Sequence, residues 1–211
     1  MSIKITGTGS YIPLLTKKND DFLNAKFLNL DGSDFKVSND VIIKKFKSIT
    51  GIEERRYAKD HHNTSDLAFF AAEKAIKDAA LDQETIDYII VAHNFGDIKS
   101  GTKQSDSLPS LASRVKFNLG IKNPNCVCYD IIFGCPGWIE GVIQAYAFIK
   151  AGMAKKCLVI GAETLSRTYD IKDRDSMIYA DGAGASIVEL KPDDKNNGIL
   201  SHKSCTFTDK E

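Results

Sequence analysis

Several features that would mark a specialised class of protein are scarce in this 211-residue chain. Lys plus Arg and Asp plus Glu number 28 each, so the formal net charge is zero, and no basic stripe suggests a nucleic-acid partner. No apolar run is long enough to span a membrane. The opening, "MSIKITGTGSYIP", alternates and lacks the apolar core and cleavage site of a signal peptide. The sequence therefore predicts a globular cytoplasmic protein with no membrane or nucleic-acid partner.

Cysteine is also scarce, and the spacing of the cysteines shows no paired motif. The chain has five cysteines, an odd number, and they form no C-x-x-C pair. Apart from His202, which lies near Cys205, the histidines are far from the cysteines in sequence, so neither a zinc site nor a disulfide framework is expected. No metal and no redox cofactor is predicted. Each thiol is then either a core filler or a reactive group. The positions are 126, 128, 135, 157 and 205.

Strand-like and helix-like segments alternate along the chain, which predicts an α/β layer fold with a mainly parallel sheet flanked by helices. Segments 14–37 and 94–107 have the composition of loops. Strands are expected over 3–9, 86–93, 125–132 and 155–163, as two short strands around a glycine turn within 176–190, and over 198–207. Helices are expected over 38–49, 63–81, 108–120 and 136–152.

The stretch "CYDIIFGCPGW", residues 128–138, sets Cys135 apart from the other cysteines. The predicted order is strand, Gly134, Cys135, Pro136, Gly137, helix, which places the sulfur at a helix N-terminus, where unpaired N–H groups favour negative charge. The two glycines leave room for a substrate, and Pro136 suits the first helical turn. Only a thiolate is a good nucleophile. Placement alone leaves two interpretations open, a nucleophile or a buried core cysteine.

Several segments, taken in order, carry a resemblance to a known family. From Ile3 to about residue 205 the chain resembles the β-ketoacyl-acyl carrier protein synthase III enzymes of the thiolase superfamily. The stretch around Cys135 resembles their D-x-x-x-x-C-x-G-F nucleophile turn. The resemblance implies a thiolase-like layered α/β fold. The segments that carry it are "ITGTGSYIP", "TGIEERRYA", "SLPSLASRVKFNLGI", "CYDIIFGCPGW" and "DRDSMIYADGAGASIVE".

The resemblance implies acyl transfer to Cys135. The thiol would take an acyl group from an acyl-CoA substrate, and its backbone N–H would supply one donor of an oxyanion hole. Malonyl-acyl carrier protein would then decarboxylate, and the carbanion would attack the thioester to give a β-ketoacyl carrier protein. The implied pathway is fatty acid or related biosynthesis. The expected partners are acyl-CoA, acyl carrier protein and a second copy of the chain.

Three further positions acquire substrate-binding roles by resemblance. Arg174 matches an arginine that helps to hold the CoA adenine. Leu108 matches a phenylalanine that reaches across a dimer interface toward the partner's acyl pocket. Trp138 stands where the family usually has phenylalanine, and either packs on a helix face or narrows the acyl channel. Lys45 stands where bacterial members often have a tryptophan, so a different CoA contact is expected there.

The resemblance covers only the first of the two similar halves of the thiolase fold. Residues 1–190 are expected to form that half, with the nucleophile, and residues 191–211 a linker and the start of the second half. The histidine and asparagine that promote decarboxylation belong to the second half, and none of the four histidines here takes their place. The sequence is therefore expected to be a fragment that does not complete the condensation by itself.

Two other functions stay open. The chain could be a non-catalytic dimerising or regulatory partner of a condensing enzyme, or another thiolase-superfamily synthase, such as one of secondary metabolism. The Gly-Cys-Pro-Gly turn and Arg174 favour an enzyme. A half-fold should expose apolar faces, which usually mark interfaces. A dimer is expected through the sheet edge near residues 183–190 and the helix after Leu108.

Overall fold

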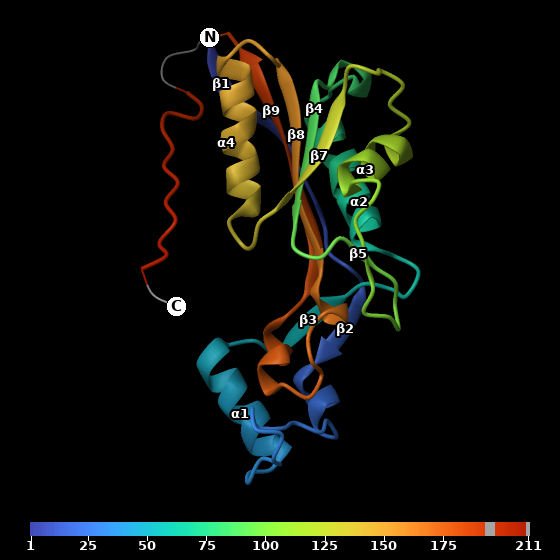
Figure 1. Ribbon diagram of the computed structural model, residues 1–211, viewed down its shortest axis with the longest axis vertical. Coiled ribbons are helices and arrows are strands. Elements are labelled where there is room, and N and C mark those ends of the chain that lie inside the picture. Colours follow the sequence, from blue (N-terminus) through green and yellow to red (C-terminus); the bar gives the residue numbers. More distant parts are fainter. Residues whose placement is uncertain (193–196, 210–211) are drawn as a thin grey trace.

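The computed structural model describes residues 1–192 and 197–209. A sheet with helices on both faces forms the larger part, and a smaller lobe projects from one end of it (Figure 1). The strands of this sheet are β1 (Ser2–Tyr11), β4 (Tyr88–His93), β7 (Val127–Ile132), β8 (Lys156–Thr164) and β9 (Asp181–Lys191). Their spatial order is β1-β9-β8-β4-β7.

The sheet is mixed. Strands β8, β4 and β7 run parallel, with Ile90 of β4 in register between Tyr129 of β7 and Val159 of β8. Strand β9 is antiparallel to both β8 and β1. The predicted α/β class is confirmed. Parallel neighbours need a crossover connection, and here α3 connects β4 to β7 while α4 connects β7 to β8.

Helices cover the two faces unequally. Helices α2 (Thr64–Asp78) and α3 (Leu111–Leu119) lie on one face, and α4 (Gly137–Lys150) lies alone on the other (Figure 1). Capping signals in the sequence set the helix starts. Asn63 forms a capping box with Asp66 at the start of α2.

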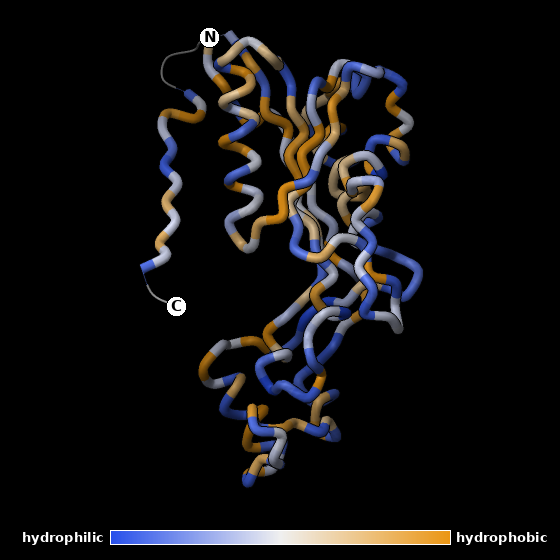
Figure 2. The backbone as a smooth tube through the Cα atoms, viewed as in Figure 1, coloured by the Kyte–Doolittle hydropathy of each residue, from blue (hydrophilic) through white to orange (hydrophobic). Residues whose placement is uncertain are grey.

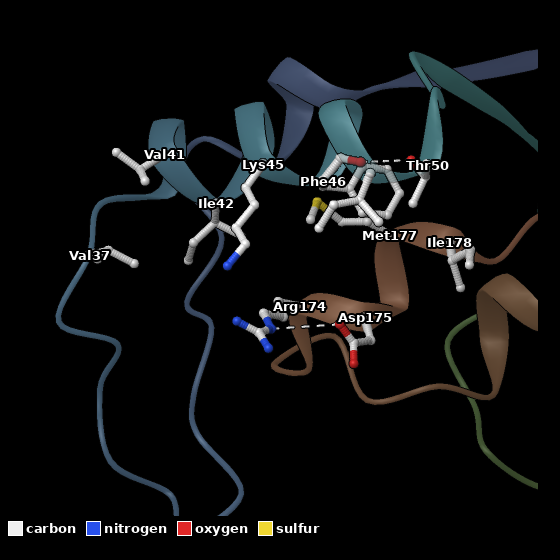
Figure 3. Close-up of a pocket in the computed structure, with 11 residues that line it drawn as sticks. Val37, Val41, Ile42, Lys45, Phe46, Thr50, Arg174, Asp175, Met177 and Ile178 are labelled. Atoms are coloured by element: carbon white, nitrogen blue, oxygen red, sulfur yellow. Dashed lines mark hydrogen bonds and ion pairs between the residues drawn. The ribbon is translucent and has the colours of Figure 1, made fainter.

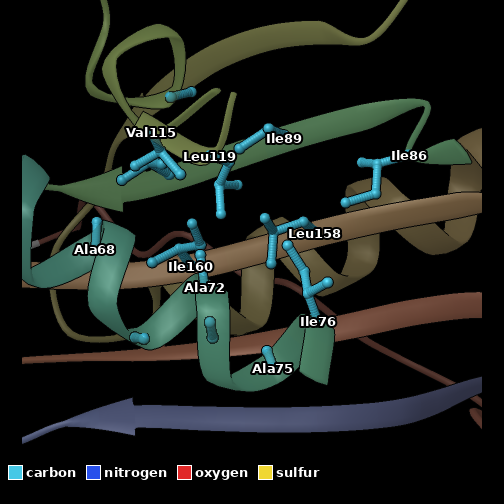
Figure 4. Packing of buried hydrophobic residues seen from close by; sticks show 14 of the residues in the cluster. Ala68, Ala72, Ala75, Ile76, Ile86, Ile89, Val115, Leu119, Leu158 and Ile160 are labelled. Atoms are coloured by element: carbon cyan, nitrogen blue, oxygen red, sulfur yellow. The ribbon is translucent and has the colours of Figure 1, made fainter. Parts of the chain in front are cut away.

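Strand β8 contributes side chains to the hydrophobic cores on both faces of the sheet, because successive side chains of a strand point to opposite faces. Leu158 and Ile160 pack with α2 and α3 (Figure 4). Cys157 and Val159 pack with α4. Figure 2 shows hydrophobic residues concentrated along these central strands, whereas hydrophilic residues cover much of the small lobe.

An alanine stripe brings α2 unusually close to β1. Ala71 and Ala75 of this stripe are fully buried. A Cβ on Gly9 would lie 2.2 Å from the carbonyl oxygen of Ala71. Glycine in β1 and alanine in α2 together therefore set the spacing of these two elements.

The small lobe is built from α1 (Asn39–Thr50) and an antiparallel pair of strands, β2 (Leu15–Lys18) and β3 (Glu54–Tyr57). Helix α1 confirms the helix predicted over 38–49, whereas β2 lies in a segment predicted as loop. The lobe has its own core of Phe22, Phe27, Ile42, Ile43 and Met177. The short elements are η1 (Asn19–Phe22), η2 (Gln83–Thr85), β5 (Asp97–Ile98), β6 (Ser105–Asp106), η3 (Leu165–Arg167) and η4 (Arg174–Ile178).

Two predicted strand arrangements were wrong. The segment 176–190 is not two strands around a glycine turn but η4 followed by the single long strand β9. Gly182 and Gly184 lie within β9, paired with Glu163 and Gly161 of β8, and neither has the positive φ that a tight glycine turn needs. The segment 198–207 is not a strand. It runs as irregular chain along α4, with one backbone bond from Ile199 N–H to the Ile3 carbonyl.

The edges of the sheet also differ from prediction. The proposed dimer edge near 183–190 is β9, which lies between β1 and β8 and has no free side. Strand β7, which confirms the strand predicted over 125–132, is an edge strand with Val127 and Ile132 exposed. Strand order depends on contacts between distant segments, so the apolar run of β7 does not reveal its edge position.

The predicted boundary between residues 190 and 191 stays a prediction. Strand β9 ends at Lys191, and residues 193–196 and 210–211 of the expected second segment lie outside the described residues. Within the described ranges, no helix combines the length and apolar character needed to cross a membrane.

Candidate active site

The carboxyl ends of β4, β7 and β8 meet at one edge of the sheet, because these three strands are parallel neighbours. Open α/β sheets bind ligands at such edges. A cavity of about 390 Å³ lies there. Its lining comes from the ends of all three strands, from the start of α4 and from β9. The lining residues are Ala92, His93, Asn94, Phe133, Gly134, Cys135, Trp138, Gly161, Ala162, Glu163, Leu165, Gly182, Ala183 and Gly184.

Cys135 lies in the turn between β7 and α4, as the sequence predicted, and its side chain is exposed to the cavity. The Gly137 N–H donates to the Gly134 carbonyl at 2.8 Å, which closes the turn around Cys135. A Cβ on Gly137 would lie 2.9 Å from the Cβ of Ala92, so the helix start presses against β4. The exposure of Cys135 excludes the interpretation of a buried core cysteine.

The other cysteines have different surroundings. Cys126 and Cys157 are buried, and Cys128 is half-buried in the edge strand. Burial raises the pKa of Cys157 to about 12, so this thiol stays protonated at neutral pH. Cys205 is exposed in the segment beside α4 and lies outside the cavity lining. Cys135 is therefore the one cysteine of the cavity.

Asn94 and Glu163 form a polar pair in the wall of the same cavity. The Oε2 atom of Glu163 accepts hydrogen bonds from the backbone N–H and from Nδ2 of Asn94, both at 2.8 Å. Burial raises the pKa of Glu163, and the Asn94 bonds only partly offset this effect. Neither residue was among the predicted site residues. The available signal was the position of each polar residue at the end of an apolar strand.

His93 also lines the cavity, but its two ring nitrogens are engaged. Nδ1 accepts the Gly96 N–H at 3.0 Å, and Nε2 lies 3.1 Å from Oδ2 of Asp130. Nε2 therefore carries the proton and donates to the carboxylate. Asp130 in turn accepts the N–H groups of Leu111 and Ala112 at the start of α3. This network joins β4, β7 and α3, and it gives His93 a structural role.

Trp138 lies in the first turn of α4 and lines the cavity with Cys135. It faces Gly161 of β8, where a Cβ would lie 3.3 Å from the Trp138 Cβ. The indole is half-buried and also packs against the core beneath α4. Trp138 thus packs beneath α4 and also lines the cavity, and its role in an acyl channel stays a prediction.

Arg174 lies in a second pocket, in the small lobe. This pocket has a volume of about 580 Å³ and shares no lining residue with the cavity of Cys135. Figure 3 shows Lys45 of α1 and Arg174 of η4 pointing toward the same space. The guanidinium carbon of Arg174 lies 5.0 Å from the centre of the Phe35 ring, and its Nε lies 3.6 Å from Oδ1 of Asp175. The rest of the lining is mainly apolar, so two cations face an apolar hollow.

Leu108 joins neither pocket. Its side chain is 86% exposed in the loop before α3. Of the four predicted site residues, the structure brings Cys135 and Trp138 together, places Arg174 apart, and leaves Leu108 at the surface. Within the described residues no group of three His, Cys, Asp or Glu side chains is arranged to hold a metal ion.

Known proteins resemble this chain over most of its length. The β-ketoacyl-[acyl-carrier-protein] synthase III 1 of Vibrio cholerae is 39% identical over 202 residues, which are 95% of this chain and 56% of that protein. The corresponding Neisseria gonorrhoeae protein is 40% identical over 201 residues. The 3-oxoacyl-[acyl-carrier-protein] synthase III structure from Aquifex aeolicus aligns with a TM-score of 0.71 at 36% identity and covers 90% of this chain and 55% of that one.

Fold and site define an α/β unit of the thiolase-like class, with an exposed cysteine on a strand-to-helix turn. The family of 3-oxoacyl-[acyl-carrier-protein] synthase III matches residues 129–206. Over most of its length the chain is similar to the N-terminal half of β-ketoacyl-acyl carrier protein synthase III proteins. It spans about half the length of the curated relatives it matches.

Proposed function

We propose that the chain carries the acyl-accepting site of a β-ketoacyl-acyl carrier protein synthase III. Cys135 takes an acyl group from an acyl-CoA for condensation with malonyl-acyl carrier protein. The observation that supports this most is the exposed Cys135 on the turn between β7 and α4, in a cavity at the carboxyl edge of the parallel strands. The similarity to β-ketoacyl-acyl carrier protein synthase III proteins supports the same chemistry.

The acyl transfer follows from the groups at the turn. The Cys135 thiolate attacks the carbonyl carbon of the acyl thioester, and the carbonyl oxygen becomes an oxyanion. The Cys135 N–H, just before the N-cap of α4, would donate to that oxyanion. The C–S bond to CoA then breaks, and the CoA thiolate leaves and takes a proton. The subsequent condensation would use a histidine and an asparagine of the family's second half.

Trp138 would set the width of the acyl channel. It lines the cavity beside Cys135 and lies against Gly161 of β8, and Gly182 and Gly184 of β9 line the same cavity without side chains. A bulky indole on one wall and glycines on the other leave a slot for a narrow acyl chain. A smaller side chain at position 138 would then admit larger acyl groups.

The pocket of Arg174 and Lys45 would receive the nucleotide end of CoA. Its apolar lining suits a flat base, and its two cations suit phosphate oxygens. Lys45 replaces an aromatic stacking surface with a point charge, so binding at this pocket should depend more on salt than a stacked adenine would.

A homodimer would form through the edge of β7. Outside its pairing with β4 this strand has no partner among the described residues, and Val127 and Ile132 are exposed. The other edge, β1, is covered in part by the segment that contains Ile199. Leu108, exposed on the same side of the molecule as α3, would then be free to contact a second copy.

Self-acylation tests the proposed function, because it needs the thiol and the pocket but not a decarboxylation residue. The chain is incubated with acetyl-CoA and with longer acyl-CoAs, and its intact mass is measured. The proposal predicts the gain of one acyl group in the native chain and none in Cys135→Ala. No gain from any donor would favour a non-catalytic partner of a condensing enzyme.

A further inference from the structure

Asn94 and Glu163 occupy the cavity of Cys135 without a part in the acyl transfer derived above. Asn94 follows β4 directly, and Glu163 lies near the end of β8, so the parallel arrangement of the two strands brings them together. Both Asn94 donors, the backbone N–H and Nδ2, bind the same Glu163 oxygen at 2.8 Å. The carboxylate thus fixes both the backbone and the side chain of Asn94.

These bonds also decide which way the Asn94 amide points. An ionised carboxylate oxygen only accepts, so the amide atom that faces Glu163 is the NH₂ group. The amide oxygen Oδ1 therefore points away from Glu163. It lies 3.7 Å from the place that a Cβ would take on Gly134, the residue before Cys135. Asn94 is exposed, so a hydrogen-bond acceptor is held open beside the nucleophile turn.

The burial of the Glu163 carboxylate is energetically unfavourable. Its second oxygen, Oε1, is buried and has no hydrogen-bond partner among the described residues. An unpaired buried carboxylate oxygen is unfavourable. His93 donates no hydrogen bond to this oxygen, because both ring nitrogens are engaged with Gly96 and Asp130. What Glu163 supplies in return is the fixed orientation of Asn94.

We propose that Asn94 Oδ1 accepts a hydrogen bond from the thioester substrate, and that Glu163 is the positioning residue that holds Asn94 in place. This proposal rests on the proposed acyl transfer to Cys135. The chemistry recognised is an N–H or O–H donor within a few atoms of the thioester. That donor lies either on the thiol side, as the amide N–H nearest the sulfur in a pantetheine arm, or on the acyl side, as a hydroxyl group.

A fixed acceptor discriminates against a substrate that lacks the matching donor, because the acceptor then loses water without gaining a partner. One neutral hydrogen bond of this kind corresponds to a preference of roughly 2- to 10-fold. The preference should be visible in the rate of Cys135 acylation and should vanish when the acceptor is removed.

The experiment follows Cys135 acylation by intact mass with small thioesters. The first arm compares the acetyl thioester of N-acetylcysteamine with the analogue that has an ester oxygen in place of the amide N–H. The second arm compares butyryl with 3-hydroxybutyryl thioesters. The native chain should prefer the substrate with the donor in one arm by roughly 2- to 10-fold, and Asn94→Ala should lose that preference.

Two Glu163 variants test the positioning role separately. Glu163→Gln keeps an oxygen that can accept both Asn94 bonds, so it should retain the preference. Glu163→Ala should lose it as Asn94→Ala does, and thermal unfolding of each variant checks that it is folded. A Glu163→Ala variant that keeps the full substrate preference would overturn the positioning role. If Glu163→Ala does not fold, the preference is measured in Glu163→Gln instead, and its loss there would overturn that role.

Two results would contradict the role of Asn94, and they differ from failure of the proposed function. Acylation of the native chain with no preference in either arm would overturn it, as would a preference that Asn94→Ala retains. Either result would leave the acyl transfer to Cys135 intact. No acylation by any thioester would overturn the proposed function and the role of Asn94 together.

Discussion

At the scale of single residues, the five thiols should differ sharply in reactivity. Cys135 and Cys205 are exposed, whereas Cys126 is buried and burial raises the pKa of Cys157 to about 12. Brief alkylation of the native chain near neutral pH should therefore modify Cys135 and Cys205 first. Peptide mass mapping checks this order. Fast labelling of Cys157 before unfolding would show that the core beneath α4 is more open than the structure has it.

Glu163 should make stability depend on pH with a defined sign. Burial raises its folded pKa above the ordinary value of 4.5, so the folded state holds this proton more tightly than the unfolded state. The free energy of unfolding should fall as pH rises from that ordinary value through the raised one. Glu163→Gln lacks this loss, so its stability relative to the native chain should increase over the same window. Urea unfolding at about pH 4 and about pH 8 measures it; a constant difference contradicts the assignment.

At the scale of elements, the contact of β1 with α2 is the most sensitive. Gly9→Ala would place a Cβ 2.2 Å from the Ala71 carbonyl oxygen and 2.4 Å from the Ala75 nitrogen. Because both atoms belong to backbone, the strand and helix must separate, and we expect a loss of about 1–3 kcal/mol or more in the free energy of unfolding.

Gly184→Ala is the matched control for that change. Gly184 lies in β9 next to the partner of Gly9, and a Cβ there meets no heavy atom within 4 Å. Its effect on stability should be small. Equal losses in the two variants, measured by chemical unfolding, would mean that the close approach of β1 to α2 does not limit stability.

Elements whose signals are local were predictable from the sequence. Helix α2 was predictable because Asn63 caps its start and the alanine stripe lies within it. The turn that carries Cys135 was predictable for a similar reason, since its residues are consecutive. Strand β9 was not, because its glycines suggest a turn until β1 and β8 pair with them on both sides. In the site, Cys135 and Trp138 are neighbours in sequence. Asn94 and Glu163 meet only through strand order, which composition and periodicity do not contain.

At the scale of the whole molecule, the unpaired β7 edge predicts self-association. Ile132→Lys places a charge on this edge and should shift the chain toward monomer, because an edge charge blocks strand pairing. Ile171→Lys is the control, since Ile171 is 72% exposed and lies outside the sheet. Light scattering across a dilution series gives the masses. A native chain that stays monomeric at every concentration would contradict the dimer.

The central claim is that this half-length chain holds a complete acyl-accepting site at Cys135. The most direct measurement compares, in one reaction with acetyl-CoA, the CoA thiol released with the acetyl group found on the peptide that contains Cys135. We expect the released CoA thiol and the acetylated Cys135 peptide in equal amounts, one of each per reacted chain, and neither in Cys135→Ala. Thiol release without an adduct, or an adduct on Cys205 or a lysine instead, would contradict it.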